Sequence, residues 1–351
     1  MNIRISDIAK LAGVSAGTVD RVLHNRGRVS EEKRALVERV LKEMNYQPNP
    51  LARTLASHRE IRILTLTPEY HIGEYWEQVN SGISHASKSL QSFGIKVDQR
   101  FFNQYNRESF SQLIARLETE ISQPEVIDGV IIATLFEQES RKIAKQLEKA
   151  QIPYILIDSN IVDCNPLAYF GADSYQSGRV AAHLLTRACV EKSILAITYA
   201  GIDGELSLQS RKRLQGFIDY LKENHHQDRF QQLTFQDGQH NYNRQLLQQV
   251  LCKLQPAGIA VFNSRVHEIV AMLTSSELHN IQLIGYDTID SNAQALREQK
   301  VAWLIGQRAT TQGFEAVKTL SNYVLFGQSP TMRNYMPIDI LTKENINYYS
   351  D

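Results

Sequence analysis

Short apolar runs alternate with longer amphipathic segments through most of this chain of 351 residues. The first series predicts strands at 61–67, 95–101, 129–133 and 154–157, with helices between them at 74–92, 107–122 and 137–150. A second series starts near Ala168 and predicts helices at 174–188, 207–223, 241–253 and 266–277, and strands at 193–198, 232–235, 259–262, 281–286 and 301–305. Strands that alternate with helices form parallel sheets with helices on both faces, so the pattern predicts an α/β, doubly wound fold.

This α/β body, residues 61–351, is too long for one sheet of the usual size. The strand and helix rhythm restarts near residue 160, which favours two lobes with one sheet each. In sheets of this kind ligands bind beyond the carboxyl ends of the strands. A binding site is therefore expected at those strand ends.

The first sixty residues have a different charge and a different pattern. They carry eleven Lys/Arg and seven Asp/Glu, a formal charge of +4, so the remaining residues carry −4 because the chain is neutral overall. A basic segment attached to an acidic body favours a nucleic-acid partner for the basic segment. The alternative is an ordinary solvated surface.

Three short helices are predicted in this basic segment. The first begins near Ser6, carries Leu11 on its apolar stripe and ends at Gly13; Ser15 then caps a second helix, and a third runs over 30–44. Two helices joined by a tight glycine-containing turn form a helix-turn-helix, whose second helix contacts base edges in the major groove. The alternative is a small helical bundle that binds protein or nothing.

The second helix offers a short set of DNA-contacting groups. Thr18 can bond a phosphate, and Arg21 can reach a phosphate or a guanine edge. Ala16 can make only an apolar contact with a base, and Gly17 offers no side chain. Asp20 is repelled by phosphate unless it accepts from a cytosine amino group or pairs with an arginine.

A proline-rich stretch follows the third helix. Pro48 and Pro50 stop that helix, and Asn49 can cap a short new helix that is too short to be stable alone. Leu55 is either a wedge for a minor-groove base step or a linker leucine that packs on the next domain. A helix that forms only against a partner would act as a hinge.

The motifs at 5–23, 29–34, 45–49 and 52–55 resemble the lactose-repressor/galactose-repressor (LacI/GalR) family of bacterial transcription regulators. The resemblance implies a homodimer on a near-palindromic duplex DNA operator, with the second helix in the major groove and paired hinge helices in the minor groove. It implies that Leu55 intercalates. The DNA-contacting positions that it implies are Ser6, Ser15, Ala16, Gly17, Thr18, Asp20, Arg21, His24, Asn25, Asn49, Ala52, Arg53 and Leu55.

Polar and aromatic residues gather at the predicted strand ends of the body. Asp158, Asn263, Asp287 and Gln307 each follow a strand, while Tyr75, Trp76 and Arg213 lie near the start of helices. Carboxylate, amide and guanidinium groups beside aromatic faces suit a polyhydroxylated ligand. The alternatives are that the polar residues cap the next segment, that the aromatic pair is core, and that Arg213 is a surface charge.

The motifs at 169–178, 213–217, 261–263, 284–287, 305–307 and 312–313 resemble the effector domain of the same family and ribose-type periplasmic binding proteins. The resemblance implies two lobes joined by crossovers near 160–165, 307–310 and 327–331. The expected organisation is a helix-turn-helix domain at 1–48, a hinge at 49–60, and an effector domain at 61–351, with an N-lobe of 61–162 and 309–328 and a C-lobe of 163–308 and 329–351. The sugar-contacting positions that it implies are Tyr75, Trp76, Asp158, Arg213, Asn263, Asp287 and Gln307.

Several function classes are disfavoured. Three widely spaced cysteines form no C-x-x-C pair, which argues against a zinc knuckle or a disulfide framework. Dinucleotide, P-loop, nucleophile-elbow and zinc-protease motifs are absent, so we expect no catalytic residue, no metal and no cofactor. No apolar run has membrane-spanning length and no signal-peptide pattern opens the chain, so a cytoplasmic location without membrane contact is expected.

The expected function is that of a transcriptional regulator of the repressor class, whose operator affinity is controlled by a sugar or sugar derivative bound between the lobes. The alternatives are an enzyme or a sugar-binding transport protein on the same α/β body without a DNA role. Turnover of a bound sugar would favour the enzyme, and export of the chain would favour the transport protein.

Overall fold

The computed structural model describes residues 5–23, 27–44, 46, 60–121, 127–201 and 203–351. The chain divides into two compact units, Met1–His58 and Arg59–Asp351. Each unit has its own hydrophobic core.

The first unit is a three-helix bundle of α1 (Ile5–Leu11), α2 (Ala16–Leu23) and α3 (Glu31–Glu43). Its core is made of small and β-branched residues from all three helices, namely Ile8, Ala9, Ala12, Val19, Val22, Val37 and Val40. Gly13 has a φ of +62°, which is the left-handed turn expected after the first helix. Of the residues expected on the apolar stripe of the first helix, Ile8 and Ala12 are buried, whereas Leu11 is 60% exposed.

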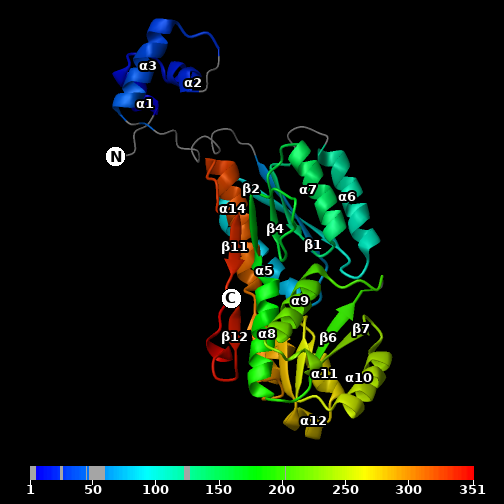
Figure 1. Cartoon of the computed structure of the whole chain (residues 1–351). Helices are drawn as coiled ribbons and strands as arrows, with labels where there is room; N and C mark the ends of the chain where they lie inside the picture. Colours follow the sequence, from blue (N-terminus) through cyan, green and yellow to red (C-terminus); the bar gives the residue numbers. More distant parts are fainter. Residues whose placement is uncertain (1–4, 24–26, 45, 47–59, 122–126, 202) are drawn as a thin grey trace. The chain divides into compact units, whose positions relative to one another are not determined.

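The second unit contains two six-stranded sheets (Figure 1), which confirms the predicted α/β class. The first sheet has the order β11-β5-β4-β3-β1-β2 and is parallel throughout. Its strands are β1 (Ile61–Pro68), β2 (Ile95–Phe102), β3 (Gly129–Ala133), β4 (Tyr154–Ile157), β5 (Ala168–Ala172) and β11 (Arg333–Met336).

The second sheet has the order β12-β10-β9-β8-β6-β7, and only its β10–β12 pair is antiparallel. Its strands are β6 (Ile194–Ala200), β7 (Phe230–Gln236), β8 (Gly258–Val261), β9 (Gln282–Tyr286), β10 (Trp303–Gly306) and β12 (Asp339–Leu341). The central strands β8 and β9 are almost completely buried, as expected for strands covered on both faces.

Helices cover both faces of each sheet. In the first lobe they are α5 (Tyr75–Leu90), η1 (Gln91–Phe93), α6 (Arg107–Ile121), α7 (Glu137–Lys149) and α14 (Ala309–Phe326). In the second lobe they are α8 (Ser174–Ala188), α9 (Leu208–Glu223), η2 (Gln227–Arg229), α10 (His240–Leu254), α11 (Val266–Met272), α12 (Ser275–Asn280), α13 (Asp290–Arg297) and η3 (Ile346–Tyr348). The helix expected over 266–277 is two helices, because Thr274 forms a capping box with Glu277 and starts α12.

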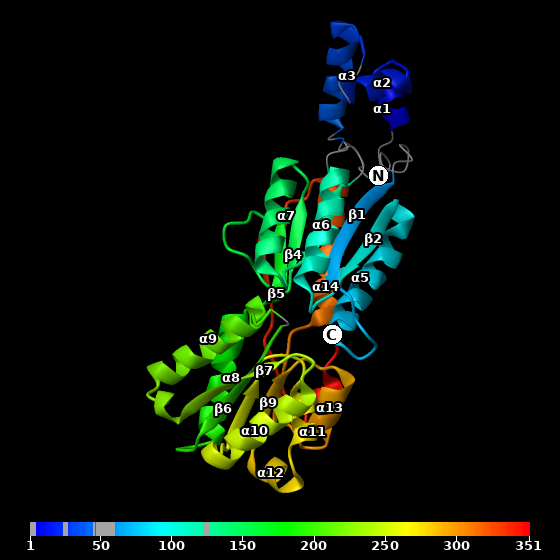
Figure 2. The same ribbon diagram turned by 90° about the vertical axis from the view of Figure 1, so that its right-hand side faces the viewer.

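Three connections cross between the lobes and can be followed in Figures 1 and 2. They are β5 to α8, β10 to α14, and β11 to β12. The second agrees with the crossover expected at 307–310. The first and third were placed too early: β5 and β11 pair with each other in the first sheet, so 168–172 and 333–336 belong to the N-lobe and not to the C-lobe.

Glycines allow two close helix crossings. A Cβ on Gly82 of α5 would lie 1.9 Å from the carbonyl oxygen of Thr310 in α14. In the second lobe a Cβ on Gly178 of α8 would lie 1.9 Å from the carbonyl oxygen of Arg213 in α9. These distances are far below van der Waals contact, so only glycine permits the observed packing, and the second crossing fixes the height of Arg213 in its helix.

Candidate functional site

The face of α2 that is predicted to contact DNA is exposed. Ser15 precedes the helix, and its Oγ accepts from the backbone N–H of Thr18 at 3.2 Å, which confirms the expected cap. The hydroxyl groups of Ser15 and Thr18 also form a hydrogen bond of 2.9 Å. Arg21 Nε donates to the carbonyl oxygen of Gly17 at 3.0 Å, so its guanidinium lies along the helix surface.

Six of the seven predicted DNA contacts that the structure describes are exposed. The exposed residues are Ser6, Ser15, Ala16, Gly17, Asp20 and Arg21, while Thr18 is half-buried. The remaining predicted DNA contacts lie outside the described residues, namely His24, Asn25, Asn49, Ala52, Arg53 and Leu55. Small and hydroxyl side chains on this face leave room for close approach to a duplex.

A cavity of about 900 Å³ lies between the two lobes of the second unit, beyond the carboxyl ends of their strands. Five of the seven predicted effector residues line it directly, namely Tyr75, Trp76, Arg213, Asn263 and Asp287. The other two, Asp158 and Gln307, are buried and hydrogen-bonded to residues that line it. The structure therefore brings all seven to one site.

Asp158 follows β4 and is 2% exposed. Its φ is +79°, a left-handed conformation that aspartate tolerates better than most residues. Tyr75 donates from its hydroxyl group to Asp158 Oδ1 at 3.5 Å, and Gln209 donates to the same oxygen from the opposite lobe. Burial raises the pKa of Asp158 to about 7, against the lowering effect of Arg213.

Arg213 and Asp287 are linked through one amide. Arg213 Nη2 donates to Gln307 Oε1 at 2.5 Å, and Gln307 Nε2 donates to Asp287 Oδ1. Arg213 Nη1 donates to the carbonyl oxygen of Phe262 at 3.0 Å. Burial raises the pKa of Asp287 to about 6, and the Arg213 charge opposes this rise.

The Arg213 guanidinium is held in place, but not all of its N–H groups have hydrogen-bond acceptors. Its Cζ atom lies 3.9 Å from the ring centroid of Tyr286, which holds the plane against an aromatic face. Nε is buried and has no hydrogen-bond partner within the described part of the chain. A buried donor without a partner carries a free-energy cost that a ligand acceptor would remove. The surface-charge alternative for Arg213 is wrong, because the side chain is 2% exposed.

Tyr75 and Trp76 serve both the core and the cavity. They are nearly buried, their rings meet edge to face at 5.2 Å, and both belong to the core that α5 and α14 form on the first sheet. Both also line the cavity. Their flat faces supply the apolar surface on which the C–H face of a sugar ring can stack.

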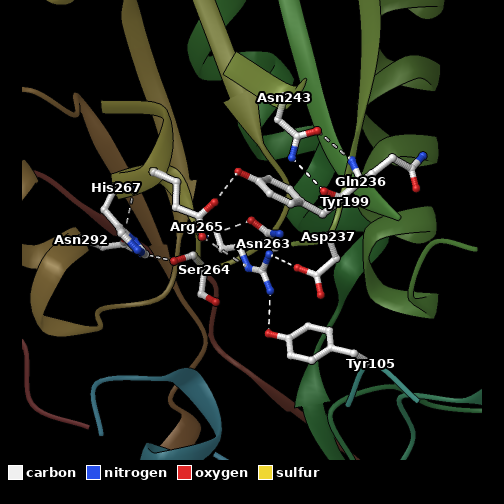
Figure 3. A network of polar contacts seen from close by, with 11 residues as sticks. Tyr105, Tyr199, Gln236, Asp237, Asn243, Asn263, Ser264, Arg265, His267 and Asn292 are labelled. Carbon is white, nitrogen blue, oxygen red and sulfur yellow. Dashed lines mark hydrogen bonds and ion pairs between the residues drawn. The ribbon is translucent and has the colours of Figure 1, made fainter. Parts of the chain in front are cut away.

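An outer network that the sequence did not reveal lines the same cavity (Figure 3). Arg265 donates to Asp237 and, at 2.6 Å, to the hydroxyl oxygen of Tyr105 from the opposite lobe. Its guanidinium also lies 5.1 Å from the ring centroid of Tyr199, whose hydroxyl group donates to Glu268 at 3.1 Å. Asp237 and Tyr105 follow edge strands, so the strand-end rule could have found them.

Asn292 holds the strand ends beside the cavity in place. Its Nδ2 donates to three carbonyl oxygens, those of Ser264 and Tyr286 at 2.9 Å and of Asp287 at 3.2 Å. Its Oδ1 therefore accepts, and the Nδ1 of His267 at 2.8 Å is the donor (Figure 3). Asn263 has a more local role, since its Oδ1 accepts from the backbone N–H of Arg265 at 3.0 Å, as the capping alternative anticipated.

Comparison with known proteins places both units. Residues 4–49 match the family described as bacterial regulatory proteins, lacI family, and residues 63–329 match the periplasmic binding protein domain. The crystal structure of a putative LacI transcriptional regulator from Bacteroides fragilis has 32% identity and a TM-score of 0.76, covering 83% of this chain and all of that one. The chain belongs to the LacI family of bacterial regulatory proteins.

Curated members of the LacI family resemble the chain more distantly. The regulator MalR of Streptococcus pneumoniae is 27% identical over 226 residues, and the match covers 63% of this chain and 63% of MalR. The regulator DegA of Bacillus subtilis is 29% identical over 226 residues, which is 64% of this chain and 62% of DegA. The chain thus spans somewhat less than two thirds of these relatives.

The fold of the body is shared beyond the LacI family. GanP, a glucose-galactose binding protein from Geobacillus stearothermophilus, has a TM-score of 0.69 at 19% identity, covering 82% of this chain and 99% of GanP. At that identity the likeness concerns the fold alone. Among the described residues of this LacI-family chain, no helix has the length and apolarity to cross a membrane, and no three metal-binding side chains cluster.

Proposed function

We propose that this LacI-family protein is a sequence-specific DNA-binding transcriptional regulator that acts as a homodimer in the cytoplasm. Its operator affinity is controlled by a small polar effector, a sugar or sugar derivative, bound between the two lobes. The observation that carries the proposal is that one chain has both an exposed helix-turn-helix face and a cleft with buried polar groups, of which the Arg213 Nε has no hydrogen-bond partner in the described part of the chain. Neither feature alone would support regulation.

The first unit supports the DNA half of the proposal. Its bundle buries valine, isoleucine and alanine and leaves the hydroxyl and guanidinium groups of α2 at the surface. Side chains of these types bond phosphates and base edges in the major groove. The relatives MalR and DegA are named as HTH-type transcriptional regulators, which supports a regulatory role over an enzymatic one.

The second unit supports the effector half. Arg213 presents an unpartnered buried donor, and Asp158 and Asp287 approach the cavity from opposite lobes. A ligand that satisfies groups on both lobes stabilises their closed arrangement. If effector and operator both favour one of two conformations of the same molecule, each must change the binding affinity of the other by the same factor.

A binding experiment with the full chain tests this proposal. A random duplex library is enriched against the protein, and the affinity for the selected duplex is measured by fluorescence anisotropy with and without a panel of carbohydrates. We expect a near-palindromic selected sequence and an effector that changes operator affinity by on the order of five- to a hundredfold. Affinity that no carbohydrate changes at saturation would contradict the effector half.

Two substitutions that each remove one positive charge separate specific from general DNA contacts. Arg21→Ala removes an exposed α2 guanidinium and should cost about 1–3 kcal/mol of binding to the selected duplex. Lys33→Ala removes the same charge from the exposed surface of α3 and should leave the sequence preference intact. If the two variants weaken specific and unspecific binding equally, α2 is not the reading helix.

A further inference from the structure

The cavity between the lobes has an uneven charge. The first lobe contributes two carboxylates to its lining, Glu74 and Glu137. The second lobe contributes six, namely Asp203, Glu205, Asp237, Glu268, Asp287 and Asp290. Against these eight stand four guanidinium groups, those of Arg107, Arg211, Arg213 and Arg265, and no described lysine lines the cavity, so the formal charge of the lining is −4.

Two of the arginines are committed to carboxylates that bridge or flank the cleft mouth. Arg107 Nη2 lies 3.3 Å from Asp203 Oδ2, across the two lobes. Arg211 Nη2 lies 2.8 Å from Glu137 Oε2, again across the lobes. Neither guanidinium is available to an incoming anion without the loss of an ion pair.

Arg265 is committed in the same way. It pairs with Asp237, lies 3.8 Å from Glu268 Oε1 and donates to Tyr105. Two carboxylates thus surround this one guanidinium. In the outer network of Figure 3, Arg265 is thus the one guanidinium between the carboxylates of Asp237 and Glu268.

Arg213 forms no ion pair within the described residues, but it interacts electrostatically with the carboxyl groups of Asp158 and Asp287. It lowers the pKa of both Asp158 and Asp287, which shows that the three groups lie within one electrostatic environment. Lys212, which precedes Arg213 in the sequence, donates to the carbonyl oxygen of Asn160 at 2.9 Å and does not line the cavity. A single N–H of Arg213 beside two carboxylates suits a hydroxyl or ring oxygen and not a phosphate.

We propose that the effector is an uncharged polyol or carbohydrate, and that the surplus of carboxylates in the cleft excludes phosphorylated and carboxylated analogues of the same skeleton. This inference rests on the proposed function, because it takes the cleft as the effector site. Hydroxyl groups donate to the many carboxylates without bringing a charge into a desolvated space. An anion would meet like charges at short range, and among the described lining residues only the Arg213 guanidinium, itself beside two carboxylates, is without an ion pair to offset them.

Matched ligand sets test the inference. Isothermal titration of the full chain at low ionic strength compares common neutral sugars and polyols with the phosphate monoester and the uronic acid of each sugar. We expect a neutral member to bind and its acidic analogues to bind on the order of a hundredfold more weakly. An acidic analogue that binds as tightly as its neutral parent, or more tightly, overturns the inference while leaving the proposed function intact. If no neutral or acidic member binds, the proposed effector site is itself wrong and the inference falls with it.

A charge-altered variant makes the cause testable. Glu205→Gln with Asp290→Asn removes two exposed carboxylates from the cavity lining. The ratio of neutral to acidic affinity should then narrow by about tenfold. Glu191→Gln with Asp228→Asn makes the same charge change at exposed positions before the amino ends of β6 and β7, and should leave the ratio unaltered. Equal ratios in the two double variants would show that cavity charge is not the discriminating feature.

Discussion

Replacement of Asp158 by asparagine should stabilise the ligand-free protein at about pH 8. The carboxyl group is buried, and burial raises its pKa from 3.8 to about 7, so folding at high pH carries the cost of an ionised buried group. Because the pKa of Asp158 is higher in the folded than in the unfolded state, the carboxyl group contributes most to the free energy of unfolding below the unfolded-state pKa. This contribution is lost as the pH rises through about 7. At 1.36 kcal/mol per pKa unit, the raised pKa of Asp158 lowers the free energy of unfolding by about 4 kcal/mol at pH 8. At pH 5 this destabilisation is only about 1.6 kcal/mol.

Asparagine keeps the shape of the side chain and removes the charge. Urea unfolding of the full chain, followed by the fluorescence of Trp76 and Trp303, measures the difference, because the two tryptophans of the sequence lie one in each lobe. We expect the advantage of Asp158→Asn over the parent to shrink by about 2.5 kcal/mol between pH 8 and pH 5. Asp228→Asn, at an exposed position, is the matched control.

Two results would refute this reasoning. A variant that is less stable than the parent at pH 8 would mean that the Asp158 hydrogen bonds outweigh its desolvation. An advantage that does not change with pH would mean that the carboxyl group does not titrate between the two conditions. Loss of ligand affinity together with the gain in stability is the expected cost at a binding site.

Three further changes test the packing around the cleft. Gly178→Ala should lower the free energy of unfolding by about 3 kcal/mol, because the new methyl group would overlap the Arg213 carbonyl oxygen. Calorimetry of the variant and the parent measures the decrease in unfolding temperature. Asn292→Ala should cost about 3 kcal/mol, since three carbonyl oxygens lose a buried donor; urea unfolding checks the value, and a neutral effect would show that water replaces the amide. Tyr105→Phe removes the 2.6 Å bond to Arg265 across the cleft, and stopped-flow fluorescence should show effector dissociation faster by about fivefold; an unaltered rate would argue that this bond does not hold the lobes together.

The central elements of the body were predictable from periodicity. The strands at 129–133 and 154–157 and the helix at 174–188 have the predicted bounds, because continuous apolar runs or an amphipathic pattern with clear ends determine them. The omitted strands are β5, β11 and β12, which have only three to five residues and lie toward the β11 and β12 edges of the sheets. Short strands at an edge depend on pairing partners far away in sequence, and this is why the lobe boundaries were misplaced.

The positions of the inner polar groups were predictable, whereas the contacts that join the outer network were not. Asp158 and Asp287 directly follow buried strands, so their position at the cleft follows from the parallel topology. Arg265 reaches the cavity only because Asp237 and Tyr105, from distant loops, hold its guanidinium. Such a meeting of three loops leaves no periodic signal in the sequence.

The two lobes repeat one topology, and this determines how an effector is held. The order β5-β4-β3-β1-β2 of the first sheet is reproduced as β10-β9-β8-β6-β7 in the second, and Asp158 after β4 occupies the same place as Asp287 after β9. In the proposed effector site each lobe thus contributes an equivalent half, and the chain joins the two halves at a high effective concentration. An effector bound by only one lobe should dissociate quickly, so a long residence time requires that both lobes bind it at once.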